Sequence, residues 1–438
     1  MKVKIIIFLI LFLILALFII NIEKINFIPA EPSDSDIGRE GESFITLTND
    51  GAWCWFADPR AVYYEGKHKR TYVGWVNEAG DIQVAYYDHE TKKITTATLK
   101  ERLQGDDHAN PALLMRHDGR LMVFYSAHGR EPMFYRLAKN PEDISSWDDE
   151  RKVGTNTEGG RGYTYPNPIQ LTKEDNVIYL FWRGGNFKPC FARSKDGINW
   201  STAKTLIKDS GDRPYIKFES DRVEKIHFSF TDGHPRIEKR NNIYYACYHN
   251  GAFYKADGSK IKDIEEIPIN PSEADKVYDA NISGARAWIW DIAIDRFGNP
   301  VIVYAALPEE TDHRYQYARW NGRNWENFEI TSAGGWFPQT QKGQKEKEPH
   351  YSGGIILDHT NPFIVYLSRQ IYGTFEIEKW MTSDGGATWT SAGITSESKK
   401  NNVRPVVPRG HKKGDAGLIW MYGDYIHYTR YYTALKMK

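Results

Sequence analysis

The chain has 438 residues, 57 of them basic and 57 acidic, so its formal charge is zero, and 14% of its residues are aromatic. A balanced charge excludes the global positive field that typically accompanies nucleic-acid binding, so we expect no nucleic-acid partner. Binding of an anionic ligand would therefore depend on basic side chains gathered at the binding site. The length fits one large all-β domain or two or three ordinary domains, and nothing in the composition indicates an oligomeric state.

The chain begins with an unbroken apolar run at residues 5–22, preceded by two lysines. A run of this kind predicts that residues 1–30 form a signal peptide or a membrane anchor, so we expect the protein to be exported. Whether this segment is cleaved or retained stays open, because no clear small-residue cleavage site follows it. Residues 31–42 are polar and predict a linker. The chain's three cysteines are too few for a disulfide framework.

A three-strand pattern then occurs seven times. Its apolar, aromatic second strand recurs about every 58 residues from Tyr72 to Ile419. The expected first strands lie at residues 57–64, 109–116, 166–172, 234–240, 290–296, 352–358 and 404–409. The expected second strands lie at residues 71–77, 121–129, 178–186, 243–251, 301–309, 363–370 and 417–424. A repeat of this length, all β and sevenfold, predicts a seven-bladed β-propeller with four-stranded antiparallel blades.

The ring is expected to close at its two ends. The last copy stops after three strands, whereas residues 43–49 form a strand pattern before the first copy. We expect this segment to supply the outer strand of the last blade, which removes open sheet edges. One propeller domain would then span residues 43–438. Two turns of the Asp-box type, at 194–200 and 382–389, are expected to be structural.

The repeat also predicts which residues face a central pocket. In each copy the first and second strands are antiparallel neighbours, so the start of one lies beside the end of the other. These places carry Phe56, Asp58, Asn77, His108, His128, Tyr163, Tyr165, Arg183, His234, His249, Trp288, Trp290, His350, Tyr351, Arg369 and Arg404. Such a concentration of titratable, cationic and aromatic groups indicates a site that binds and acts on an acidic sugar polymer.

Each of these residues also has a structural interpretation. A single His at a strand end is more often a hydrogen-bonded structural group than a catalyst. For a pair of His residues on one hairpin, the structural and the catalytic interpretations are about equally favoured. One of Tyr163 and Tyr165 can simply fill the channel, and Arg183 can pair with a local carboxylate. Trp288 and Trp290 fit packing together with a platform for sugar rings.

Four segments, at residues 105–129, 161–171, 181–186 and 231–251, resemble the BNR-repeat propellers that include the ulvan lyases of marine bacteria. The resemblance covers nearly the whole chain after residue 43. It implies a polysaccharide lyase that cleaves a uronic-acid-containing, sulfated polymer by β-elimination and leaves a 4,5-unsaturated uronate. It further implies that the catalytic residues are His108, His128, Tyr165 (or Tyr163) and Arg183.

The residue types suit this chemistry. The C6 carboxylate must be neutralised, a base must take the C5 proton, and an acid must protonate the departing O4. Arg183 offers a planar fork for the carboxylate, and imidazole serves as base or acid near neutral pH. Which His is the base stays open, and the chemistry requires no cofactor. Further substrate contacts are expected from Tyr163, His249, Trp290, His350 and Arg369.

A structural zinc ion is one expectation for the fourth copy, because the resemblance extends to lyases that hold zinc. His234, Cys247 and His249 come from its expected inner strands, and Cys190 is the fourth candidate ligand. Cysteine and histidine are ligands that zinc prefers. The spacing matches no standard zinc motif, so buried Cys and hydrogen-bonded His remain the alternative.

Two other functions stay open. A sialidase-like hydrolase would need an arginine triad, for which Arg60, Arg236 and Arg404 are the candidates. A non-catalytic, surface-anchored propeller that binds glycans would also suit the apolar N-terminus and the aromatic pocket. The products distinguish these possibilities, because only a lyase makes an unsaturated uronate.

Overall fold

The computed structural model describes residues 44–438, apart from 131, 160–161, 209–212, 413 and 415–416. The chain divides into two units after Ile37, and the described residues all belong to the second. The predicted signal or anchor segment (1–30) and the predicted linker (31–42) lie outside the described residues. Within the described part, no helix is long and apolar enough to cross a membrane.

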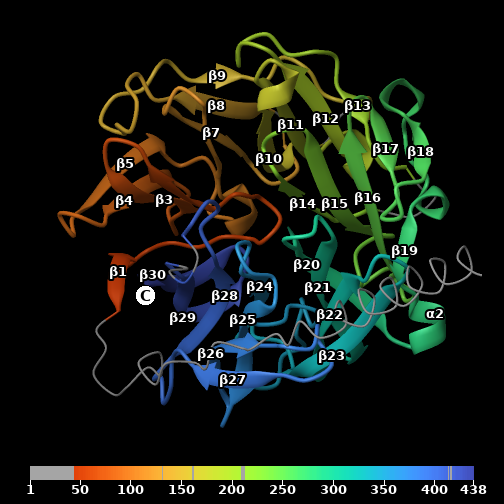
Figure 1. The fold of residues 1–438 in the computed structure, drawn as a ribbon. Coiled ribbons are helices and arrows are strands. Elements are labelled where there is room, and N and C mark those ends of the chain that lie inside the picture. Colours follow the sequence, from red (N-terminus) through yellow and green to blue (C-terminus); the bar gives the residue numbers. More distant parts are fainter. Residues whose placement is uncertain (1–43, 131, 160–161, 209–212, 413, 415–416) are drawn as a thin grey trace, which may run out of the picture. The chain divides into compact units, whose positions relative to one another are not determined.

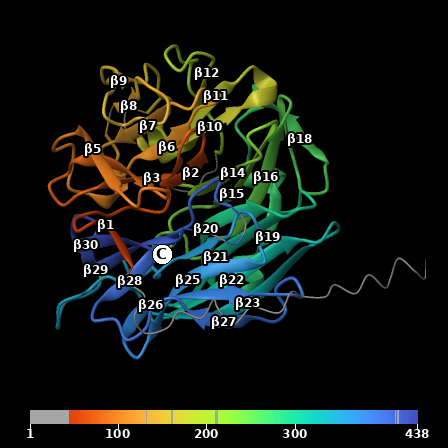
Figure 2. The same ribbon diagram turned by 60° about the vertical axis from the view of Figure 1, so that its left-hand side comes forward.

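The described residues form seven antiparallel sheets that follow one another around a ring (Figures 1 and 2). Blades one to three comprise β2 (Ala61–Glu65), β3 (Lys69–Val76), β4 (Ile82–Asp88), β5 (Ile94–Lys100); β6 (Ala112–Met115), β7 (Leu121–Ser126), β8 (Met133–Leu137), β9 (Arg151–Lys152); and β10 (Thr164–Leu171), β11 (Val177–Arg183), β12 (Pro189–Ser194), β13 (Lys204–Thr205). Blade four comprises β14 (Ile216–Ser220), β15 (Lys225–Thr231), β16 (Ile243–His249), β17 (Ala252–Tyr254), β18 (Lys260–Asp263) and β19 (Asp275–Tyr278).

Blades five to seven complete the ring. They comprise β20 (Arg286–Ile294), β21 (Pro300–Glu309), β22 (Asp312–Trp320), β23 (Trp325–Gly334); β24 (Ile355–Leu357), β25 (Ile364–Ile371), β26 (Thr374–Met381), β27 (Thr390–Gly393); and β28 (Asn401–Val406), β29 (Ile419–His427), β30 (Arg430–Met437), β1 (Ile45–Thr48). Short helical turns are η2 (Asp107–Ala109), η3 (Thr172–Glu174), η4 (Gly185–Phe187), η5 (Ile264–Glu266), η6 (Pro271–Glu273) and α2 (Ala280–Ser283). The predicted all-β, seven-bladed propeller is confirmed.

The ring closes as the sequence predicts. Strand β1 pairs antiparallel with β30, so the last blade has the order β1-β30-β29-β28 and holds both ends of the described chain (Figure 1). The two Asp-box turns are hydrogen-bonded turns within blades three and six. In the second, Asp384 accepts from the backbone N–H of Thr388 at 2.9 Å, and Trp389 Nε1 donates to the Gly386 carbonyl at 2.9 Å.

Blade four differs from its prediction. Its first strand is β14, whereas residues 234–240, the predicted first strand, lie in the connection between β15 and β16. The repeat pattern does not predict β14, because this strand carries the charged residues Lys217 and Glu219 where an apolar strand is expected. In the structure both side chains form ion pairs near the axis. The segment predicted as the second strand is therefore the third strand, β16. Its last residue, His249, lies at the opposite end of the blade from the predicted position.

Burial falls from the axis outwards. The second strand β7 is buried along its whole length, whereas the outer strand β5 is mostly exposed on alternate residues, as expected for strands packed between blades and strands facing solvent. The segment between β1 and β2 fills the axis. Its Trp53 and Trp55 donate to the carbonyls of Arg404 and Ile289 at 3.1 Å, and the Asp58 N–H donates to Pro166 at 3.2 Å. These bonds tie it to blades seven, five and three.

Candidate active site

A cavity of about 110 Å³ opens where the second strands end and the first strands begin. We call it the histidine cavity. Its lining includes Phe56, His108, His128, Tyr165, Arg183, His234, Trp288 and Tyr351 from the predicted set, together with Cys54, Trp55, Arg213, Tyr215, Arg236, Glu348 and Tyr428. The antiparallel pairing of inner strands therefore gathers residues that are far apart in sequence, as predicted.

Two imidazoles on blade two share one carboxylate. His108 lies in η2 and His128 follows β7, and their rings stack at 4.1 Å between centroids with an interplanar angle of 5°. The Nδ1 atoms of His108 and His128 lie 2.7 and 2.9 Å from the two oxygens of Asp106. A carboxylate only accepts hydrogen bonds, so both Nδ1 atoms carry protons. The neutral form of either ring then has its lone pair on Nε2.

The two imidazoles differ in protonation. Burial opposes a charge on His108, but the negative potential of Cys54, Asp106 and Asp107 outweighs it and raises the pKa well above 6.5. Burial and the positive charge of His108 lower the pKa of His128 to about 4, against the opposing hydrogen bond to Asp106. At neutral pH the pair therefore consists of an imidazolium next to a neutral imidazole, which suits paired proton donation and acceptance.

Arg183 ends β11 and points a buried guanidinium at the same cavity. Its Nη1 donates to the hydroxyl of Tyr215 at 3.1 Å, and its Cζ lies 4.7 Å from the ring centre of Tyr165. Its Nε and Nη2 have no hydrogen-bond partner, and no described carboxylate forms an ion pair with it. A buried cation with two unused donors is a ready site for a carboxylate ligand.

Tyr165 is held in the cavity by an irregular backbone. Its φ of +62° is unusual for a residue other than glycine, and the pairing of β10 with β11 shifts register between Thr164 and Asn167. Asn167 stabilises the bulge, because its Nδ2 donates to the carbonyls of Phe56 and Tyr165 at 2.9 Å each. Burial is the main cause that raises the pKa of Tyr165 well above 10, so its hydroxyl keeps its proton.

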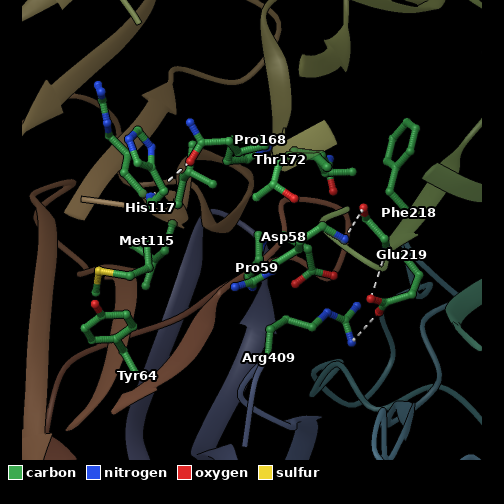
Figure 3. A pocket seen from close by; sticks show the side chains of 18 residues that line it. Asp58, Pro59, Tyr64, Met115, His117, Pro168, Thr172, Phe218, Glu219 and Arg409 are labelled. Atoms are coloured by element: carbon green, nitrogen blue, oxygen red, sulfur yellow. Dashed lines mark hydrogen bonds and ion pairs between the residues drawn. The ribbon is translucent and has the colours of Figure 1, made fainter. Parts of the chain in front are cut away.

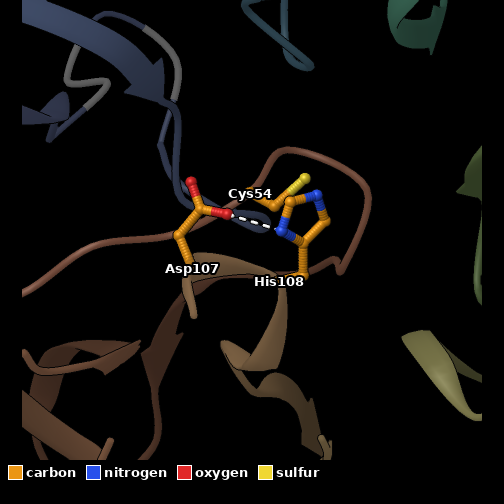
Figure 4. A group of neighbouring side chains, drawn as sticks. All are labelled: Cys54, Asp107 and His108. Atoms are coloured by element: carbon orange, nitrogen blue, oxygen red, sulfur yellow. Dashed lines mark ion pairs between the residues drawn. The ribbon is translucent and has the colours of Figure 1, made fainter. Parts of the chain in front are cut away.

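Below His108 lies a set of fixed charges. Asp107 Oδ1 is 2.8 Å from His108 Nδ1, and its other oxygen accepts from Arg404 and, at 2.7 Å, from the hydroxyl of Tyr425. Figure 4 shows the thiol of Cys54 beside the His108 ring. Cys54, Asp107 and His108 lie close enough together to hold a metal ion. The Asp107 carboxylate is already paired with His108 and Arg404, however, so the set does not offer a free carboxylate ligand.

The wall opposite the imidazoles is built from connections between strands. Arg236 Nη1 pairs with Glu348 Oε1 at 3.2 Å, and burial raises the pKa of Glu348 above 4.5. His234 lies between them and Trp288, with its pKa lowered well below 6.5 mainly by burial. The prediction missed Arg213 and Glu348 because neither stands at a predicted strand end. Tyr428 directly follows β29, so the strand-end rule could have found it.

Five predicted substrate contacts lie outside the cavity lining. Tyr163 stacks on Trp182 and donates its hydroxyl to the carbonyl of Thr155. Arg369 forms two bonds with Glu378, at 2.6 and 3.1 Å. His249 lies at the far end of blade four.

The other two, Trp290 and His350, are buried behind the lining. Trp290 stacks at 4.3 Å under Trp55, which does line the cavity. His350 precedes the lining residue Tyr351, and burial lowers its pKa to about 3. Both can position the lining residues in front of them without contacting a ligand.

The predicted zinc ligands do not come together. His234 lines the histidine cavity, whereas Cys247 lies in β16, with its sulfur 3.9 Å from Nε2 of His227. His249 lies 3.7 Å from Glu224 Oε2, and Cys190 is buried in β12 of blade three. Because His234 belongs to another end of the blade than His249, these four residues do not fit a zinc ion.

Comparison with known proteins supports this description of the molecule. Residues 70–333 match the model of a BNR repeat-containing family. The chain belongs to this family. Among curated proteins, this BNR-repeat chain is 22% identical over 390 residues to an ulvan lyase from Nonlabens ulvanivorans, covering 77% of this chain and 76% of that one.

Two further relatives match less of their length. The chain is 24% identical to the PL25 ulvan lyase of Pseudoalteromonas sp. (strain PLSV), covering 59% of this chain and 62% of the relative. It is 29% identical to an ulvan lyase of Alteromonas sp. (strain LOR), covering 61% and 63%. The chain thus spans just under two thirds of these two relatives.

Solved structures agree on the fold. A PL25 ulvan lyase bound to a GlcA(1-4)Rha3S fragment matches with a TM-score of 0.68 and 17% identity, covering 90% of this chain and 95% of that one. The polysaccharide lyase Uly1 matches with a TM-score of 0.56 and 13% identity, covering 92% and 94%. At these identities the likeness concerns the propeller itself.

Proposed function

We propose that this propeller is a polysaccharide lyase that cleaves a uronate-containing, sulfated polysaccharide of the ulvan type by β-elimination. The observation that carries the proposal is the stacked pair of His108 and His128, which share Asp106 but differ in protonation, in one cavity with the unpaired donors of Arg183. The relatives named as ulvan lyases agree with this chemistry.

The reaction begins with recognition of the uronate. Arg183 binds the C6 carboxylate through Nε and Nη2, which have no other hydrogen-bond partner. Neutralising this carboxylate makes the C5 proton more acidic, because the negative charge that develops on removal of that proton spreads into the carboxyl group. Burial strengthens this effect, because the attraction between two opposite charges is stronger inside a protein than in water.

Proton transfer follows. His128 Nε2, unprotonated at neutral pH, takes the proton from C5, and the electron pair of the C5–H bond forms the C4–C5 double bond. The C4–O4 bond breaks, and the departing O4 receives a proton from Nε2 of the His108 imidazolium. Tyr165 keeps its own hydroxyl proton and donates a hydrogen bond to O4, which stabilises the charge that develops there before His108 transfers its proton. The proton on His128 then returns to solvent while His108 is reloaded, so the pair ends as it began.

The cations on the outer wall suit a sulfated polymer. Arg213 and Arg236 line the cavity in addition to Arg183, and Arg236 is 53% exposed, so it is accessible to an incoming chain. A uronate and a neighbouring sulfate ester need two separate cationic positions. We assign the inner position to the carboxylate and the outer one to the sulfate.

A sialidase-like hydrolase is disfavoured by the position of its arginine candidates. Arg60 pairs with Asp58 at 2.8 Å within the axial segment, and Arg404 is fully buried against Asp107. Of the three candidates, Arg236 alone lines the histidine cavity. A triad that clamps one carboxylate is therefore not assembled.

Export remains part of the proposal. Ulvan-type polymers are too large to enter a cell intact, so an enzyme acting on them is needed outside the cytoplasm. The apolar run at residues 5–22 supplies a signal peptide or an anchor for this purpose.

The test is incubation of the protein without residues 1–30 with ulvan, followed by near-ultraviolet absorbance of the unsaturated uronate. We expect activity in the parent protein and a loss of about 10²–10⁴-fold in His128→Ala, as for removal of a general base. His249→Ala is the matched control, because this histidine lies at the opposite end of its blade. New reducing ends without absorbance would identify a hydrolase, and binding without cleavage would identify a glycan-binding propeller.

A further inference from the structure

A second cavity lies at the other end of the inner strands (Figure 3). Its volume is about 250 Å³, and it shares no lining residue with the histidine cavity. It is lined where first strands end, at Met115, Thr172 and Ser220, and by Asp58 and Arg409 at its inner wall. We call it the arginine cavity. It is larger than the histidine cavity, and the proposed lyase reaction makes no use of it.

Behind the arginine cavity lies a buried network of charges. Lys217 and Arg60 pair with Asp58, and His359 lies 2.6 Å from Glu219 and 2.9 Å from Asp291. Arg409 is 3.3 Å from Asp291 and 3.5 Å from Glu219. The network contains the carboxylates of Asp58, Glu219 and Asp291 and the cations of Arg60, Lys217, Arg409 and His359.

The cations outnumber the carboxylates. Burial and Arg409 oppose a charge on His359, but Asp291 and Glu219 outweigh them and raise its pKa above 6.5. With His359 protonated, four positive charges face three negative ones. The Nη1 atom of Arg409 has no hydrogen-bond partner with good geometry. An excess of positive charge in a buried region is costly unless an anion balances it.

Arg222 brings one more positive charge to the rim of the cavity, where its side chain is exposed. It belongs to the turn between β14 and β15, and it lines the arginine cavity. No ion pair joins Arg222 to a carboxylate among the described residues. Two guanidiniums, the exposed one of Arg222 and the buried one of Arg409, thus line one cavity. The two carboxylates in the same lining, Asp58 and Glu219, already pair with other cations of the network.

The remaining walls combine polar side chains, among them Asn167 and Gln170, with a group of apolar ones. Met115, Ile169 and Phe218 line the cavity together with Leu113 and Pro168, and Figure 3 shows Met115 and Phe218 on opposite sides of the charged wall. The volume lies slightly below the roughly 300 Å³ at which pockets for drug-sized ligands begin. The occupant that fits is therefore small, with an anionic end and an apolar or ring-shaped body.

We propose that the arginine cavity binds a small organic carboxylate, with its anionic end between Arg222 and Arg409 and its body between Met115 and Phe218. This site is independent of the lyase reaction, and its failure would leave the proposed function untouched. A bare inorganic anion would use the same two arginines but would leave the apolar walls without a contact. Sulfate is therefore the discriminating probe.

The test is calorimetric titration of the full-length chain with benzoate and, separately, with sulfate. We expect benzoate to bind more tightly than sulfate, and Arg222→Gln to weaken benzoate binding about 10-fold or more, as for loss of a charge-assisted hydrogen bond. Arg102→Gln is the matched control and should leave benzoate binding unchanged, because Arg102 is also an exposed arginine with a positive φ but lines neither cavity. Because Arg222 lies on a turn and has no ion-pair partner, its substitution should preserve the melting temperature.

The outcomes separate clearly. No heat with either probe would overturn the site. Equal binding of sulfate and benzoate would overturn the role of the apolar walls. Loss of benzoate binding in Arg183→Gln but not in Arg222→Gln would place the ligand in the histidine cavity instead.

Discussion

The two ends of the propeller axis use charged residues in opposite ways. In the histidine cavity, Arg183 keeps two donors unpaired and His128 keeps a free Nε2. At the other end, Lys217 is fully buried, donates to the carbonyl of Trp55 at 2.5 Å and pairs with Asp58. One short segment, from Trp53 to Arg60, contributes to both. Charges that hold the fold together are paired, whereas those left unpaired in a cavity mark chemistry or binding.

The largest effect, on the free energy of unfolding, is expected at the end of the axis where Lys217 pairs with Asp58. Lys217→Met leaves Asp58 buried with one fewer cation, and breaking a buried ion pair costs about 3–5 kcal/mol. The charges of Arg60, Lys217 and Arg409 now outweigh burial and lower the pKa of Asp58 to about 2. Chemical denaturation measures the free energy of unfolding. A loss below about 1 kcal/mol would mean that Lys217 does not hold the axial segment in place.

A comparable effect is expected in the histidine cavity, but on the rate of catalysis instead of on the stability of the fold. Arg183→Gln removes the charge that binds the uronate carboxylate, so kcat/KM for ulvan should fall about 10²–10³-fold, as for loss of one preorganised donor in an active site. Arg183→Lys keeps the charge but lacks the planar fork, so its kcat/KM should lie between those of the parent protein and of Arg183→Gln. The melting temperature should change little, because Arg183 forms no ion pair with a described carboxylate. An unchanged kcat/KM in Arg183→Gln would remove this residue from the reaction.

A smaller effect, visible in the pH profile, is expected for Asp106→Asn. His108 must be charged to donate its proton, and Asp106 helps raise its pKa well above 6.5. Removing this negative charge lowers that pKa, so the alkaline limb of the kcat/KM profile should move to lower pH by roughly 1–3 units. The acid limb reports His128, whose pKa is about 4, and removing Asp106 lowers it further. The activity between pH 5 and 6 should therefore suffer least.

An equal loss at every pH would contradict this assignment. It would mean that Asp106 only orients the two rings. Asp107, which also contacts His108, offers no equivalent test, because its substitution would leave Arg404 buried without its carboxylate partner.

The sequence predicts those parts of the site that follow from strand pairing. His108, His128, Arg183 and Trp288 were found because antiparallel hairpins bring strand ends together. Periodicity failed for blade four, where β14 buries Lys217 and Glu219 in ion pairs that no single-chain pattern reveals. That failure misplaced His249 and the supposed zinc ligands.

Other parts of the site depend on features that have no periodic signal. Tyr165 rather than Tyr163 lines the cavity because a bulge with positive φ turns its side chain inwards. Glu348 and Arg213 come from connections, whose paths depend on tertiary contacts. Pattern reasoning therefore locates a site on a repeat fold but does not complete its lining.

The smallest effect is expected for Arg369→Gln, which tests that limit directly. Arg369 stands near the end of β25, where the strand-end rule predicted a substrate contact, but it pairs with Glu378 and lies outside the cavity lining. A partly exposed ion pair contributes about 0–1 kcal/mol. We therefore expect kcat/KM for ulvan to stay within about twofold of the parent protein. A larger loss in kcat/KM at unchanged stability would show that the polymer reaches beyond the cavity, across the outer face of blade six. The strand-end rule would then describe the extended substrate path better than the cavity does.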